Sequence, residues 1–190
     1  MQVIKNLIWK FPLEKHNDIK SHLLEYIEND LIGKQYANSS DQLNKTDYFS
    51  RKSGDDLPYY YQVLYENAQD YLWETCNRYC VLNLIQENVW YQQYIEKDTH
   101  SWHIHPNSNL SFVYNLELEN SHSSTEFYDI ENKKIVQLDI NEGEILTFPS
   151  YLIHRSAPLV GKRKTVISGN FNFDYVDQSF VDQSLIHIDK

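Results

Sequence analysis

Residues 101–106 read Ser-Trp-His-Ile-His-Pro, and this stretch decides the fold that we expect for the chain. His103 and His105 lie two residues apart. On a β-strand this spacing points both imidazoles to the same face of the sheet. We therefore expect a strand of a β-rich domain from which two imidazoles converge on one point.

A third histidine and a pair of cations follow at a distance. Residues 148–154 read Phe-Pro-Ser-Tyr-Leu-Ile-His, so that His154 stands at the end of an apolar segment. Residues 163–170 read Arg-Lys-Thr-Val-Ile-Ser-Gly-Asn, a strand pattern with cations at its start. Three converging ligands beside a fixed cation indicate a catalytic mononuclear metal site that holds an acidic co-substrate.

The order of these motifs resembles that of the iron(II)- and 2-oxoglutarate-dependent oxygenases, in particular the small phage and bacterial branch related to prolyl hydroxylases. The resemblance covers roughly Trp90 to Phe173, and residues 8–13 are similar to the usual start of these proteins. It implies an Fe(II) centre, with 2-oxoglutarate and dioxygen as co-substrates. It also implies oxidation of 2-oxoglutarate to succinate and carbon dioxide, coupled to hydroxylation of a C–H bond. The prime substrate is not written in the sequence.

The pattern along the chain predicts one mainly β domain with supporting helices, built as a double-stranded β-helix, or jelly-roll, barrel. Helical periodicity predicts a helix over residues 16–31, with Asn17 as its N-cap, and one long helix over 61–79. We expect residues 1–85 to contain an opening strand near Val3–Trp9, helical support and a polar, lid-like loop at 33–58 with at most one short strand. Residues 86–175 are expected to form the barrel core, and 176–190 a C-terminal tail.

The proposed ligand set departs from the wider family at one position. Most members carry a carboxylate two residues after the first histidine, which completes a triad of two histidines and one carboxylate. This chain has His105 there, so that the resemblance implies an iron site of His103, His105 and His154. The alternative is that His105 stands behind the ligands and that Glu126 or Asp129 supplies a carboxylate from another strand.

The resemblance also implies a cation that holds the distal carboxylate of 2-oxoglutarate. Arg163 and Lys164 both stand at spacings after His154 that occur in the family, and strand alternation allows only one of them to face the metal. Arg163 shares its face with Thr165, which would place a hydroxyl beside the guanidinium. Lys164 aligns better with the closing Ser-x-Asn at Ser168–Asn170. We favour Arg163 slightly and expect His100, His122 and His16 to be solvated.

Composition sets the wider limits. A formal charge of −10 and a pI near 5.2 argue against general binding to nucleic acid or anionic membranes. The two cysteines, Cys76 and Cys80, are expected to be buried thiols in a reducing cytoplasm, and neither a signal segment nor a membrane span is expected. Two other functions remain open: a three-histidine, cupin-like dioxygenase without 2-oxoglutarate, and a non-catalytic metal-binding barrel. The oligomeric state is not predicted.

Overall fold

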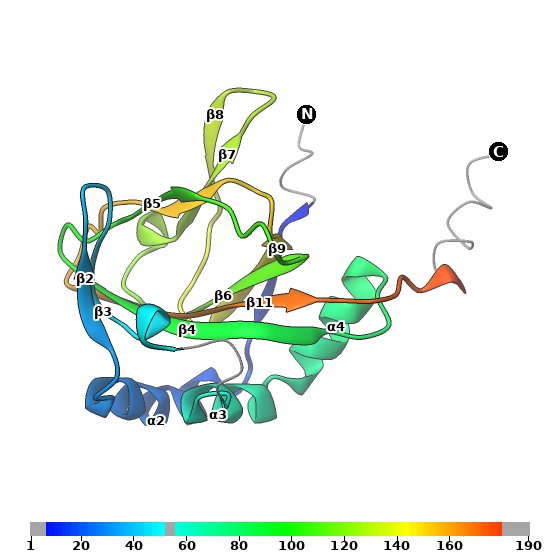
Figure 1. Ribbon diagram of the computed structural model, residues 1–190, viewed down its shortest axis with the longest axis horizontal. Helices are drawn as coiled ribbons and strands as arrows, with labels where there is room; N and C mark the ends of the chain where they lie inside the picture. Colours follow the sequence, from blue (N-terminus) through cyan, green and yellow to red (C-terminus); the bar gives the residue numbers. More distant parts are fainter. Residues whose placement is uncertain (1–6, 52–55, 180–190) are drawn as a thin grey trace.

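Two antiparallel β-sheets face one another in the computed structural model, which describes residues 7–51 and 56–179 (Figure 1). The larger sheet has seven strands in the order β1-β9-β6-β11-β4-β3-β2, and the smaller has four in the order β5-β10-β7-β8. The strands are β1 (Trp9–Pro12), β2 (Lys34–Ala37), β3 (Gln42–Thr46), β4 (Ile85–Ile95), β5 (His100–His103), β6 (Leu110–Leu118), β7 (Thr125–Asp129), β8 (Lys134–Gln137), β9 (Glu144–Pro149), β10 (His154–Ser156) and β11 (Arg163–Asn172). This arrangement confirms the predicted mainly β, jelly-roll class.

The centre of the larger sheet is β11, which pairs with β4 on one side and with β6 on the other. Lys164 lies opposite Tyr94 in β4, and Asn170 lies opposite Asn88. Ten consecutive residues of β11 are intermediate or buried, as expected of a strand that is covered on both faces. This strand therefore separates the molecule's two apolar cores.

The smaller sheet brings two distant histidines together. In the antiparallel pair of β5 and β10, His103 and His154 are direct Cα partners, although they are 51 residues apart in the sequence. Opposite residues in such a pair lie about 5 Å apart. The predicted convergence of these two side chains is thus a consequence of strand register.

Helices cover the outer face of the larger sheet, as the lower part of Figure 1 shows. They are α2 (His16–Asn29), α3 (Tyr59–Asn67) and α4 (Gln69–Tyr79). Two predictions were wrong here. The helix expected over 61–79 is broken at Ala68 into α3 and α4, and Asn17 is not a cap because α2 begins at His16, after Lys15.

The polar segment after α2 is more regular than predicted. Strands β2 and β3 form a hairpin that adds to the free edge of β4, and a 3₁₀ turn at Tyr48–Ser50 follows. The hairpin turn also reaches the smaller sheet, because the Asp41 carboxylate accepts hydrogen bonds from the backbone N–H and the hydroxyl of Ser101. The segment that we expected to be a lid-like loop is therefore a hairpin that is hydrogen-bonded to the strand carrying His103.

Two apolar cores hold the layers together. One lies between the helices and the larger sheet and includes Ile167 and Phe171 of β11. The other lies between the sheets and includes Val166 and Phe148. Most of the opening strand expected at Val3–Trp9 falls outside the described residues, as does most of the expected tail; the first strand that the structure describes is Trp9–Pro12. Among the described helices, none has the length and apolar character needed to cross a membrane.

Candidate metal centre

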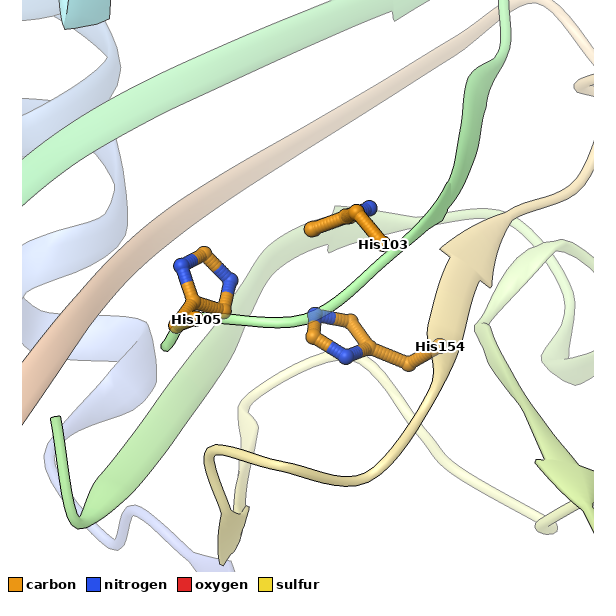
Figure 2. A group of neighbouring side chains, drawn as sticks. All are labelled: His103, His105 and His154. Carbon is orange, nitrogen blue, oxygen red and sulfur yellow. The ribbon is translucent and has the colours of Figure 1, made fainter. Parts of the chain in front are cut away.

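Three imidazoles converge on a cavity that is lined by residues of both sheets. His103 ends β5, His154 begins β10, and His105 lies in the loop just after β5 (Figure 2). One ring nitrogen from each lies within 4.8 Å of the others. Ligands that each stand about 2.0–2.1 Å from one ion can be no farther apart than about 4.2 Å, so a small inward movement would complete a three-nitrogen site.

The local backbone prepares His103 and His154 to bind a metal. The Nδ1 of His103 lies 2.7 Å from the carbonyl oxygen of Ser101, and the Nδ1 of His154 lies 2.8 Å from that of Leu152. A carbonyl oxygen can only accept, so each Nδ1 must carry the proton. The lone pair of a neutral ring is then on Nε2, and a hydrogen bond of this kind is the usual support of a metal-bound histidine.

His105 is held differently. Its backbone N–H donates to the carbonyl oxygen of Ser150 at 2.9 Å, which anchors the loop after β5 to the end of β9. The ring packs against Trp90 with centroids 5.6 Å apart, and its Nδ1 lies 3.4 Å from the amide nitrogen of Asn170. Its ring therefore has an amide partner in place of a backbone carbonyl.

Burial keeps the three rings neutral. Burial, together with the neighbouring His103 and His100, lowers the pKa of His105 to about 4. Burial likewise lowers the pKa of His103, and holds that of His154 well below its usual range. Neutral imidazole is the form that binds a metal, so no proton has to be displaced at neutral pH.

The carboxylates considered as alternative ligands lie elsewhere. Glu126 is paired with Arg155 at 2.7 Å, and Asp129 accepts hydrogen bonds from the turn residue Asn132. Within the part of the chain that the structure describes, the histidine group contains no carboxylate. The geometry thus favours His105, and neither Glu126 nor Asp129, as the third ligand.

A buried lysine lines the same cavity as the three histidines. Lys164 is 2% exposed, and its Nζ donates to the carbonyl oxygen of Ser123 at 2.8 Å and to the hydroxyl of Ser156 at 2.7 Å. The ring of Tyr94 lies 4.7 Å from this nitrogen. Burial lowers the pKa of Lys164 to about 7. No carboxylate among the described residues forms an ion pair with it, so an anionic ligand would supply the missing partner.

Arg163 and Thr165 lie on the opposite face of β11. The guanidinium of Arg163 pairs with Glu28 of α2 at 2.8 Å and with Glu117 of β6 at 2.6 Å. The Thr165 hydroxyl donates to the same Glu117. The structure thus turns Lys164, rather than Arg163, toward the histidines, which is the reverse of the orientation that we favoured.

A fourth histidine, which we expected to be solvated, also lines the cavity. His100 lies beside His103 with ring centroids 4.1 Å apart, and its Nδ1 is 3.3 Å from the amide nitrogen of Gln92. Strand alternation would place residues three apart on opposite faces. The register of β5 against β10 shifts by one residue here, with Ser156 opposite His100, and such a bulge turns a side chain to the other face. The sequence carried no signal for that bulge.

A second cleft opens beside the histidines, between the β2–β3 hairpin and the strand that bears His103. Aromatic and apolar side chains form its outer walls, and none of the Lys, Arg, Asp or Glu residues that the structure describes lines it. The wall residues are Tyr36, Leu43, Tyr48, Phe49, Trp90 and Ile104, with Gln92, His100, His103 and His105 at the inner end. The cleft shares His100, His103 and His105 with the histidine cavity, whereas Lys164 lines that cavity but not this cleft.

Comparison with known proteins identifies the architecture. No family model matches the sequence, and no curated protein does so. Solved structures do match. A 2OG-Fe(II) oxygenase family oxidoreductase from Burkholderia pseudomallei has a TM-score of 0.68 at 8% identity, over 92% of this chain and 89% of that one. The viral collagen prolyl hydroxylase of Paramecium bursaria Chlorella virus-1, in its 2OG complex, has a TM-score of 0.60 at 11% identity, over 89% and 97%.

A third match extends the likeness to an enzyme solved with a peptide. The prolyl hydroxylase of Trichoplax adhaerens, in complex with a peptide fragment of hypoxia inducible factor, has a TM-score of 0.62 at 16% identity, over 90% of this chain and 86% of that one. At such identities the likeness concerns the fold. The chain therefore has the fold of the 2OG-Fe(II) oxygenases and prolyl hydroxylases.

Proposed function

We propose that this protein is an iron(II)- and 2-oxoglutarate-dependent dioxygenase that hydroxylates a C–H bond of a protein side chain or a small molecule. The observation that carries the proposal is a single cavity with three neutral, converging imidazoles and a buried lysine that forms no ion pair with any residue the structure describes. Metal ligands and a cation are the two features that a chelating dicarboxylate requires. The solved structures of similar fold support the same chemistry.

The residues divide the work between metal and co-substrate. His103, His105 and His154 would hold the iron through ring nitrogens and leave the remaining coordination positions to ligands. When bound, the iron would supply the oxidation chemistry that side chains lack. Lys164 would hold the distal carboxylate of 2-oxoglutarate, in place of Arg163.

The surroundings of Lys164 suit that role. Its Nζ already lies between two neutral acceptors, Ser123 and Ser156, so it has a defined position. The nearby Glu126 carboxylate forms its ion pair with Arg155 instead. Because its pKa is near 7, a carboxylate nearby would draw it fully into the charged form. At neutral pH the lysine would thus be partly charged in the free protein and fully charged when the co-substrate is bound.

The aromatic cleft is the route we infer for the prime substrate. It reaches His103 and His105 from the hairpin side, so that a bound group would face the metal while 2-oxoglutarate occupies the Lys164 side. The absence of charged side chains from its described walls favours an uncharged target group. We also infer a reducing compartment, because Cys76 and Cys80 are both free thiols.

Succinate release tests the proposal. The purified protein should convert 2-oxoglutarate to succinate on addition of iron(II), and His103→Ala and His154→Ala should lose this activity together with stoichiometric metal binding. Oxygen consumption without 2-oxoglutarate would instead indicate a cupin-like dioxygenase. Tightly bound zinc in a closed tetrahedral site, with no turnover, would indicate a non-catalytic barrel.

A further inference from the structure

Strand β11 approaches β4 closely at Gly169, and the next residue, Asn170, lies beside His105. A Cβ on Gly169 would lie 2.8 Å from the Asn88 carbonyl oxygen and 2.5 Å from a ring carbon of Phe112, so only glycine lets β11 approach β4 this closely. The β11–β4 register then shifts immediately after Asn170. The extra residue of this shift is Glu87 in β4, so β11 keeps its alternation and Asn170 lies on the same face of the strand as Lys164.

The Asn170 amide is buried and fully engaged. It is 2% exposed, and its Nδ2 donates to the side-chain oxygen of Asn88 at 2.7 Å while standing 3.4 Å from Nδ1 of His105. Its Oδ1 accepts from the hydroxyl of Ser111 at 2.7 Å, and Ser111 is in turn bonded to Ser150 at 2.8 Å. The Ser150 carbonyl also holds the His105 backbone, so one network supports both parts of this residue.

This partner differs in kind from those of the other two histidines. His103 and His154 face backbone carbonyl oxygens, which fix the proton on Nδ1 and leave Nε2 free. An amide can present either its NH₂ group or its oxygen, by a half-turn about Cβ–Cγ. Asn88 and Ser111 can each donate or accept, so both can remain hydrogen-bonded to the amide in either arrangement.

We propose that Asn170 is a positioning residue for His105 and decides which of its ring nitrogens is free to bind a metal. With the NH₂ group toward Nδ1, a neutral ring carries its proton on Nε2, and that nitrogen has no lone pair for a metal. With the oxygen toward Nδ1, the proton moves to Nδ1 and Nε2 becomes a ligand. His105 is therefore a conditional third ligand, whose engagement requires the amide to turn. The inference rests on the proposed metal site but not on 2-oxoglutarate.

Tautomers can be read directly by long-range ¹H–¹⁵N NMR. In the metal-free protein, His103 and His154 should be protonated on Nδ1 and His105 on Nε2. Zinc, used as a diamagnetic probe, should convert His105 to the Nδ1–H form. Asn170→Asp, which can only accept, should show that form without zinc. An Nδ1–H tautomer of His105 in the metal-free wild type, or a tautomer unaffected by Asn170→Asp, would overturn the proposal.

Zinc affinity, measured by calorimetry, is the second test of the proposal. Asn170→Leu should weaken zinc binding by about 10- to 100-fold, the usual effect of removing the partner of a metal-bound histidine, and Asn170→Asp should bind at least as tightly as wild type. Both differences should vanish in a His105→Ala background. Asn172→Ala, two residues along the same strand, is the matched control and should leave zinc affinity unchanged.

The two experiments distinguish a failure of the role of Asn170 from a failure of the metal site itself. If His103→Ala also leaves zinc affinity unchanged, the proposed metal site is wrong. If His103→Ala abolishes binding while Asn170→Leu, shown to be folded by circular dichroism, binds as wild type, only the role of Asn170 is refuted. If Asn170→Leu does not fold, the tautomer and affinity of Asn170→Asp decide the question.

Discussion

Lys164→Met should weaken the binding of 2-oxoglutarate while leaving the fold intact. Methionine fills a similar volume without a charge, so that the loss is that of the Nζ contacts alone. A hydrogen bond to a charged group is worth about 1.5–3 kcal/mol, which corresponds to a roughly 10- to 150-fold weaker affinity. Arg163→Met, one residue away but directed toward Glu28 and Glu117, is the matched control and should change the affinity little.

The same lysine predicts a pH dependence with a definite sign. The carboxylate binds the protonated form, and the pKa of Lys164 in the ligand-free protein is about 7. Affinity should therefore be constant below pH 6 and fall as the pH rises through 7. At pH 8 about one molecule in eleven is protonated, so that binding should be about tenfold weaker than at the acid limit.

Protein stability should move in the opposite direction. Burial depresses the pKa of Lys164 below the value of an exposed lysine, so the unfolded chain binds more protons than the folded one between about pH 7 and 10. The free energy of unfolding of the ligand-free protein should thus rise with pH across this window, and Lys164→Met should remove that rise. The free energy of unfolding measured for this variant also shows whether it is folded under the conditions of the binding assay.

Isothermal titration of 2-oxoglutarate in the presence of manganese, from pH 6 to 9, measures the affinity and its pH dependence. In buffers of different ionisation enthalpy, proton uptake should accompany binding near pH 7 and be absent in Lys164→Met. Affinity that does not vary with pH, or an unchanged affinity in Lys164→Met, would refute the assignment. Loss of binding in Arg163→Met alone would return the role to Arg163.

Three further substitutions test the site and its support. His105→Asp restores the common ligand triad and should retain metal binding and 2-oxoglutarate turnover, and a loss as severe as that in His105→Ala would exclude this position as a ligand. Gly169→Ala places a methyl group against the Asn88 carbonyl and should lower the free energy of unfolding by about 1–3 kcal/mol, measured with urea. Asp41→Ala removes two hydrogen bonds to Ser101, and should weaken zinc binding without changing the secondary structure seen by circular dichroism.

The histidines could be predicted from the sequence because their spacing has a direct geometric meaning. The orientation of β11 was also present in its pattern. Ile167 and Phe171 are in phase with Arg163, whereas Ser168 and Asn170 are in phase with Lys164. A side lined by large apolar residues packs on helices, and a side with small polar residues lines a cavity. Spacing from His154 alone did not decide between the two cations.

Other features had no readable signal. In the β2–β3 hairpin, β2 is largely exposed and β3 has Leu43 as its single apolar residue, so neither shows the apolar alternation that marks a half-buried strand. The break at Ala68 interrupts an otherwise continuous helical stripe without a proline or glycine. The placement of His100 depends on a one-residue shift between β5 and β10, which only tertiary pairing determines.

The register of His103 against His154 has a consequence for how the protein folds. Their pairing closes a chain segment of 51 residues, and long closures of this kind carry an entropic cost that local structure does not. Strand β5 is also a short edge strand whose neighbour in the sheet is β10, so it should be among the first of the described strands to open. An ion that binds only the closed form would hold this strand in place by mass action, with about 2.7 kcal/mol at a free concentration one hundred times its Kd. Iron would then stabilise the pairing of β5 with β10, and hydrogen exchange in residues 100–103 should slow when the ion is added.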